Sequence, residues 1–134
     1  MIKKLLRASA ALITVLSLSV SAFASSYITN DVKTYYGRLE ANPYSQTSKR
    51  FTSTTGKNSS GNVSEVTVGL SILNYYTGGT IDEDFTRKYN TREASVNCYA
   101  AYSVVTDVSA FGSHSAYNNG SCMFYAYTDA IYEM

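Results

Sequence analysis

Apolar and polar residues alternate most clearly between Ser64 and Tyr76. Even-numbered positions carry aliphatic side chains, whereas odd-numbered positions are mostly polar. Because successive side chains of an extended strand point to opposite faces, a period of two predicts a strand with one buried face. The residues predicted to point inward are Val66, Val68, Leu70 and Ile72.

Two more strands are predicted before this one. Val32–Ala41 alternates in the same way and ends before Pro43, since proline cannot donate a hydrogen bond within a sheet. Gln46–Thr55 is a polar, threonine-rich run, and the turn-forming residues 56–61 connect it to Ser64–Tyr76. These three pieces predict a hairpin between the two runs.

The second half of the chain carries further strand patterns. Gly78 and Gly79 break the chain, and Ile81–Tyr89 follows as a short strand. Ala94–Phe111 is long enough for two strands or for one bent strand. Asn118–Gly120 is a strong hairpin-turn sequence, and Cys122–Ile131 follows it as the last predicted strand.

One segment, Arg87–Ala101, also fits a helical period, but its Asn, Thr, Val, Cys and Tyr content favours a strand. Six or seven short strands separated by turns predict an all-β fold, a small antiparallel β-sandwich. Residues 25–134 contain no repeat or linker and are expected to form a single domain.

The first 24 residues have the pattern of an export signal. A basic start with Lys3, Lys4 and Arg7 precedes the apolar run Ala8–Val20, and small residues lead to a predicted cut before Ser25. The apolar run is shorter than the roughly 20 residues that cross a bilayer. We therefore expect a secreted, extracellular (or periplasmic) bacterial protein whose mature form has no membrane span.

Removal of the leader changes the charge balance. The precursor has a formal net charge of +1, but three of its 11 basic residues lie in the leader, which leaves the mature chain mildly acidic. No large Lys/Arg cluster remains, so nucleic-acid binding is not expected. All 13 tyrosines lie in the mature part, which has no tryptophan.

The two cysteines are Cys98 and Cys122. In an exported chain the default expectation is a disulfide between them, contributing about 3 kcal/mol by restricting the unfolded chain. Their spacing does not match a redox-active C-x-x-C pair.

The single histidine, His114, is a candidate base for a nearby serine, with Asp107 or Asp129 as the group that orients it. The G-x-S-x-G nucleophile motif is missing, and ordinary zinc-ligand spacing is not found. The favoured interpretation is a polar loop histidine, so we predict no catalytic residue, no cofactor and no enzyme activity.

The acidic run around Asp82 and Asp84 is a weak candidate calcium site, because alternate residues of an extended chain point the same way. The alternative interpretation is a solvated acidic turn. It is favoured because the run lacks the spacing of a dedicated calcium loop.

The tyrosine pattern is the main functional feature. If the aliphatic faces point inward, alternation places several tyrosines on outer surfaces, where they form an amphipathic platform for sugar rings or a partner protein. The alternative is that tyrosine simply fills sheet surfaces. The predicted binding residues are Tyr36, Tyr75, Tyr99, Tyr125 and Tyr127.

The stretch His114–Asn118, with the exported size and the aromatic-rich β pattern, resembles lactococcin-972-type bacteriocins, small secreted β-sandwich proteins of Gram-positive bacteria. This chain is longer, lacks tryptophan and contains cysteine, so no functional residue is transferred. The leading hypothesis is a non-enzymatic protein that binds a cell-surface glycan or protein. The resemblance implies a bacteriocin-like toxin as the alternative, and a small hydrolase centred on His114 is third.

Overall fold

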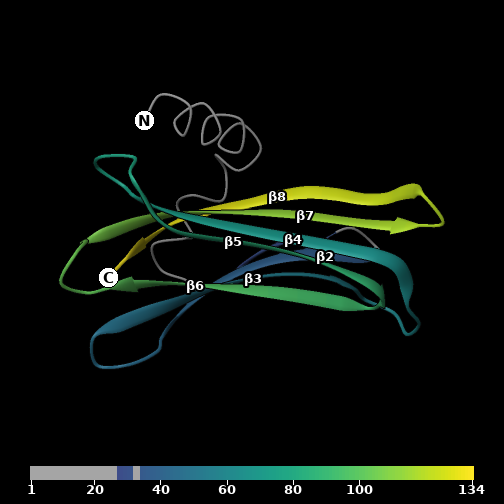
Figure 1. Ribbon diagram of the computed structural model, residues 1–134, viewed down its shortest axis with the longest axis horizontal. Helices are drawn as coiled ribbons and strands as arrows, with labels where there is room; N and C mark the ends of the chain where they lie inside the picture. The colour runs from purple at the N-terminus through teal and green to yellow at the C-terminus, as the bar shows by residue number, and fades with distance from the viewer. Residues whose placement is uncertain (1–26, 32–33) are drawn as a thin grey trace.

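The chain forms a sandwich of two antiparallel sheets (Figure 1). The computed structural model describes residues 27–31 and 34–134, so the predicted leader lies outside the described residues. The described strands are β1 (Tyr27–Asp31), β2 (Tyr35–Pro43), β3 (Ser48–Lys57), β4 (Val63–Asn74), β5 (Thr80–Thr91), β6 (Glu93–Ala101), β7 (Asp107–Asn118) and β8 (Ser121–Glu133).

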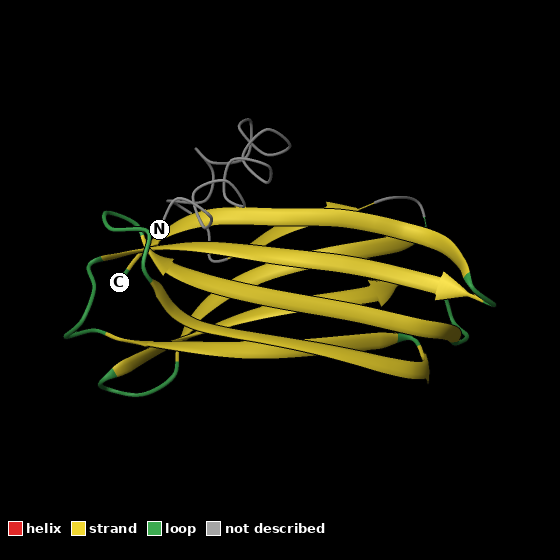
Figure 2. Ribbon diagram, turned by 45° about the horizontal axis from the view of Figure 1, so that its top comes forward, coloured by secondary structure: helices red, strands yellow, loops and turns green. Residues whose placement is uncertain are grey.

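Each sheet has four strands. The first, in the order β1-β2-β3-β6, is called sheet A, and the second, in the order β5-β4-β7-β8, is called sheet B. The connections β3–β4, β5–β6 and β6–β7 pass from one sheet to the other, whereas β4–β5 and β7–β8 are hairpins. Figure 2 shows the strands of the two sheets packed as layers. The predicted all-β sandwich is therefore confirmed.

The inner faces of both sheets form one hydrophobic core. The inward residues predicted for β4 are at most 2% exposed, and Leu39 and Phe51 of sheet A are fully buried against them. Because the alternation along β4 is regular, its odd positions form the outer face of sheet B. This outer face carries the candidate site described below.

The predicted hairpin between Gln46–Thr55 and Ser64–Tyr76 is wrong. β3 pairs with β2 and β6, whereas β4 pairs with β5 and β7. The connection at residues 58–62, which contains glycine and serine, joins β3 of sheet A to β4 of sheet B. It does not fold the chain back within one sheet. Loop composition predicted a turn correctly but did not distinguish a hairpin from a crossing between sheets.

Most other local predictions fit the described strands, but β2 was expected to end before Pro43 and instead includes it, with Pro43 opposite Lys49. Asn119 and Gly120 adopt positive φ angles of 50° and 82° in the tight turn between β7 and β8, as the Asn-Gly sequence predicts. The ambiguous segment Arg87–Ala101 is extended, and it divides at Arg92 between β5 and β6. Ala94–Phe111 contributes to two strands, and β1 is an additional strand that the pattern did not predict.

The predicted Cys98–Cys122 disulfide is wrong, because both cysteines are free. Cys98 is fully buried on the inner face of sheet A, where its thiol contacts the Leu70 carbonyl at 3.7 Å. Cys122 is exposed at the start of β8, beside the hairpin turn. The two residues thus lie on different sheets, one in the core and one at the surface.

Over residues 27–31 and 34–134, no helix is long and apolar enough to span a membrane.

Candidate binding surface

The outer face of sheet B gathers side chains from all four of its strands. In an antiparallel sheet, residues opposite each other point to the same side. The register places Phe85 opposite Gly69, Gly69 opposite Ser113, and Ser113 opposite Tyr127. A single row across the sheet therefore has an aromatic residue at each end and small residues in the middle.

The middle of this face is a strip of small residues on β4 and β7, four of which carry a hydroxyl group, and we call it the hydroxyl floor. Thr67 and Ser115 are hydrogen-bonded to each other and are 8% and 5% exposed. A Cβ on Gly69 would lie 2.5 Å from Ser113 Oγ and 3.4 Å from the Phe85 ring, so both side chains extend over this glycine. The floor consists of Thr67, Gly69, Ser71, Ser113 and Ser115.

Exposed aromatic residues flank the floor on the two edge strands, and we call them the aromatic borders. On β5, Phe85 and Tyr89 are 58% and 66% exposed. On β8, Tyr125 and Tyr127 are 62% and 36% exposed, and their ring centroids lie 5.2 Å apart. Because three strand spacings separate β5 from β8, the backbones of the two edge strands are about 14 Å apart.

The phenols of Tyr125 and Tyr127 are hydrogen-bonded to each other. This bond, followed by burial, raises the pKa of Tyr127. Because a phenol both donates and accepts, each hydroxyl of the pair keeps capacity for a further hydrogen bond to a ligand.

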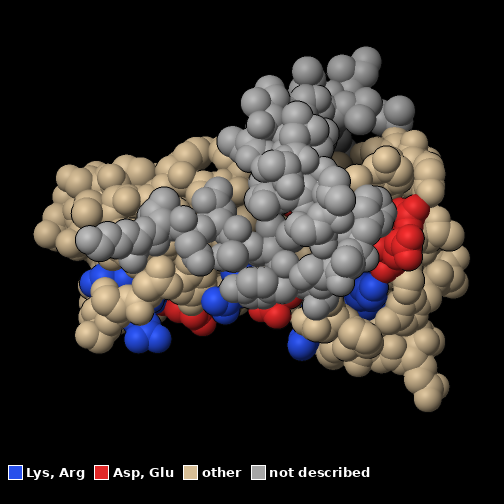
Figure 3. All heavy atoms as spheres, turned by 180° about the vertical axis from the view of Figure 1, so that it is seen from behind, with Lys and Arg blue, Asp and Glu red and all other residues tan. Residues whose placement is uncertain are grey.

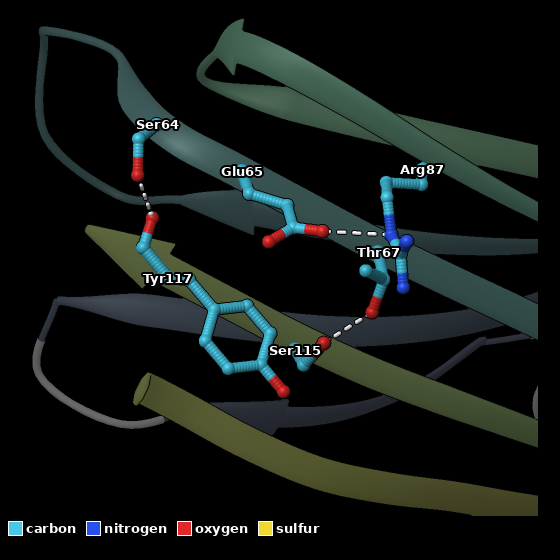
Figure 4. Close-up of polar contacts among 6 residues, drawn as sticks. All are labelled: Ser64, Glu65, Thr67, Arg87, Ser115 and Tyr117. Carbon is cyan, nitrogen blue, oxygen red and sulfur yellow. Dashed lines mark hydrogen bonds and ion pairs between the residues drawn. The ribbon is translucent and has the colours of Figure 1, made fainter. Parts of the chain in front are cut away.

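One end of the face carries an ion pair. Arg87 Nε lies 2.7 Å from Glu65 Oε1, next to the Thr67–Ser115 contact (Figure 4). In the same view, the Ser64 hydroxyl donates to the Tyr117 carbonyl at 2.9 Å, which ties β4 to β7. The pairing of Arg87 with Glu65 leaves this end of the face without an excess of either charge.

Asp129 lies further along β8, opposite Phe111. Its side chain is only 3% exposed, and its Oδ2 atom has no hydrogen-bond partner. Burial raises the pKa of this carboxyl to about 6. Asp129 was predicted only as an orienting group for His114, but it lies on the opposite side of β8 from the core, where Thr128 contacts the histidine.

The five predicted tyrosines do not form one platform. Tyr125 and Tyr127 share the outer face of sheet B, whereas Tyr36 and Tyr99 belong to the outer face of sheet A. Tyr75 lies in the turn after β4 and is 46% exposed there. Alternation predicted the side of the strand for Tyr36, Tyr99, Tyr125 and Tyr127, but it did not predict which sheet each strand joins or that β4 ends before Tyr75.

Tyr36 is also far less accessible than predicted, since it is only 7% exposed. Its ring lies over Gly56, where an added Cβ would be 2.4 Å from the ring, and the Arg38 guanidinium stacks 4.7 Å from its centroid. Burial and its hydrogen bond to Glu93 raise the pKa of Tyr36 to about 12. Tyr36 therefore packs on its own sheet.

Sequence reasoning missed Phe85 and Tyr89, although a usable pattern was present. Both occupy odd positions of the predicted strand Ile81–Tyr89, in register with the polar positions of Ser64–Tyr76. The alternation could have identified them once the pairing of these two strands was known.

His114 is a core residue rather than the predicted loop residue. It is 1% exposed, with Nδ1 2.9 Å from Thr55 Oγ1 and Nε2 2.8 Å from Thr128 Oγ1. Burial lowers its pKa to about 4, opposed by a hydrogen bond with the Thr54 backbone. Both ring nitrogens have partners in the core, so a ligand at the surface does not contact them.

The candidate calcium residues already bind backbone groups. Asp82 accepts hydrogen bonds from the N–H groups of Glu83 and Tyr99, at 2.9 and 3.0 Å, and Asp84 accepts from the N–H of Phe85 at 2.8 Å. They lie in strand β5 and not in the solvated turn of the alternative interpretation. Over the described residues, no group of three or more His, Cys, Asp or Glu side chains is placed to hold a metal ion.

Charges on the side of the molecule in Figure 3 are mixed, with basic and acidic side chains interspersed where they are visible. No family model matches the chain, and a search of curated proteins also found no match. The resemblance to lactococcin-972-type proteins therefore stays a prediction.

Proposed function

We propose that this protein is an exported, non-enzymatic binding protein that holds a glycan chain of a cell surface on the outer face of sheet B. The observation that carries the proposal is the row of small hydroxyl residues between two exposed aromatic borders. The proposed contact residues are Phe85, Tyr89, Tyr125 and Tyr127, with the partly exposed Ser113 of the floor beneath them.

The chemistry of this face suits an uncharged sugar polymer. Aromatic rings pack against the C–H faces of sugar rings, and phenol hydroxyls bond to sugar hydroxyls at the same time. Because the floor residues have small side chains, a flat ligand can lie over them between the aromatic borders, while Ser113 and the Phe85 ring cover Gly69 itself. Since Arg87 is paired with Glu65, the face offers no unbalanced cation for a polyanion.

An extended ligand fits better than a small one. The borders run along both edge strands, whose backbones are about 14 Å apart, so the face between them is a strip and not an enclosed pocket. The predicted export signal is consistent with a target outside the cell. The burial of His114 gives no support to a hydrolase, because a substrate on either outer face does not contact the imidazole.

The test is to replace the aromatic residues of each border and to measure binding. Phe85→Ser with Tyr89→Ser, and Tyr125→Ser with Tyr127→Ser, are compared with the parent for binding to insoluble cell-wall polysaccharides and whole cells. We expect each double variant to lose at least about tenfold in affinity, since a ring contact contributes about 1 kcal/mol.

The matched control is Tyr75→Ser, which removes an exposed tyrosine from a turn outside the face. Unchanged binding by folded double variants, or an equal loss in the control, would contradict the proposal. Circular dichroism and the unfolding midpoint establish that each variant is folded.

A further inference from the structure

A second cluster of exposed aromatic residues lies at one end of the outer face of sheet A. Tyr44 follows β2 and is 59% exposed, and Tyr99 of β6 is 39% exposed. Their ring centroids lie 4.9 Å apart with the planes tilted by 58°. Arg50 of β3 lies opposite Tyr99 in the sheet register, and its guanidinium is 5.8 Å from the Tyr44 ring centroid.

The backbone around this cluster is fixed by hydrogen bonds. The N–H groups of Tyr44 and Ser45 both donate to the Ser48 carbonyl at 3.1 Å, and the Ser45 hydroxyl accepts from the N–H groups of Thr47 and Ser48. The turn that carries Tyr44 is therefore anchored to the start of β3. This places Tyr44 on a defined support and not on a free loop.

Arg50 lacks an anionic partner. Its Nε atom is buried and has no hydrogen-bond acceptor. Among the residues that the structure describes, the ion pair within 4.0 Å joins Arg87 to Glu65 and does not involve Arg50. A guanidinium remains charged at every physiological pH, and a buried N–H without an acceptor destabilises the protein. Arg50 as a whole is only partly buried, so an anion at the cluster would pair with its charge.

The acidic residue of β5 that approaches β6 forms no ion pair with this arginine. Asp82 approaches β6, where its carboxylate accepts hydrogen bonds from the N–H groups of Tyr99 and Glu83. Those bonds direct Asp82 toward the backbone.

We propose that Arg50, Tyr44 and Tyr99 form a second binding site, whose ligand is a sugar that carries a carboxylate. The planar guanidinium matches a carboxylate, with which it forms two parallel hydrogen bonds. The two tilted tyrosine rings offer an apolar surface for the sugar ring. This site lies on the opposite sheet from the proposed neutral-glycan face, and it selects its ligand by charge.

The test uses oligogalacturonate as the acidic probe and a neutral oligosaccharide of equal length as its counterpart. We expect Arg50→Gln to weaken binding of the acidic probe at least tenfold and to leave binding of the neutral probe unchanged. Arg50→Lys should recover only part of the loss, because lysine keeps the charge but cannot form the planar pair.

Arg92→Gln is the matched control, because it removes an exposed arginine at the β5–β6 corner. If Arg50→Gln and Arg92→Gln lose equal affinity for the acidic probe, net charge alone causes the effect and the proposal is overturned. Failure of the parent protein to bind the acidic probe would also overturn it. Neither outcome bears on the sheet B face, which is tested by the border variants.

Discussion

His114 is held in its neutral form by the core of the sandwich. Its two nitrogens face hydroxyls of Thr55 and Thr128, and its pKa falls from an ordinary 6.5 to about 4. The folded state therefore binds the proton less tightly than the unfolded chain does. The free energy of unfolding should fall as the pH drops from 6.5 toward 4, by about 3 kcal/mol in total from this residue.

Asp129 has the opposite effect. Burial raises its pKa from 3.8 to about 6, so the ionised carboxylate destabilises the folded state at neutral pH. This penalty disappears as the pH falls from about 6 toward 4, which raises the free energy of unfolding by up to about 3 kcal/mol. Over the same interval, the contributions of His114 and Asp129 largely cancel.

Asp129→Asn should reveal the pH dependence of stability that His114 contributes. Without the compensating carboxyl, we expect the variant to lose about 2 kcal/mol more stability than the parent between pH 7.5 and pH 4.5. Urea unfolding at the two pH values measures the difference. Asp84→Asn, which changes an exposed carboxylate, is the substitution control. Parallel pH profiles for Asp129→Asn and the parent would contradict the cancellation.

Gly37 leaves the space that the His114 ring occupies. A Cβ at this position would lie 2.4 Å from the imidazole Cδ2, and both residues are buried. We expect Gly37→Ala to lower the free energy of unfolding by about 2 kcal/mol, because a packed core cannot accept the added methyl group. Gly79→Ala is the control, since its nearest neighbour would be the Thr77 hydroxyl at 3.3 Å. Equal stabilities of the two variants would argue against this packing.

At the scale of elements, local patterns predicted strands and turns better than they predicted partners. The alternation of β4 and the Asn119–Gly120 turn depend on neighbouring residues alone, and both fit the structure. Strand pairing depends on which sheet each strand joins after a loop. The connection at residues 58–62 has the composition of a hairpin turn but joins the two sheets. Local chemistry therefore could not identify the partner of β3.

Prediction of the candidate surface from the sequence is limited in the same way. Alternation predicted that Tyr125 and Tyr127 point outward, and they do. The partners of Tyr127 across the sheet, Ser113 and then Gly69 and Phe85, follow from the order of the strands. Because that order is set by contacts distant in sequence, the aromatic borders could not be assembled from the sequence alone.

The β7–β8 hairpin offers a test at this scale. Gly120 has a φ of 82°, and a Cβ there would meet nothing within 4 Å, so the effect of substitution comes from the backbone alone. Gly120→Ala should therefore destabilise the protein by about 1 kcal/mol. Gly120→Asn should lose less, since asparagine tolerates positive φ. Chemical unfolding measures both, and equal losses would contradict a purely conformational cause.

At the scale of the whole molecule, the sandwich is held together without a covalent cross-link in the described chain. Sheet A and sheet B share one core, in which Phe51 packs edge-on against Tyr132 with ring centroids 5.7 Å apart. The Lys49 ammonium adds a hydrogen bond to the Glu133 carbonyl at 2.6 Å, which joins β3 to the end of β8. Stability therefore comes from packing between the sheets, and reducing agents should not lower it.

The two thiols test this architecture. Cys122 is exposed, whereas Cys98 is fully buried, and burial raises the pKa of the Cys98 thiol to about 12. A maleimide should label Cys122 rapidly in the folded protein and Cys98 only after unfolding, because the thiolate is the reactive form. The melting temperature should be the same with and without reductant, and Cys122→Ser should abolish the rapid labelling. A lower melting temperature in reductant, together with no labelling of the folded protein, would instead establish the cross-link that the sequence predicted.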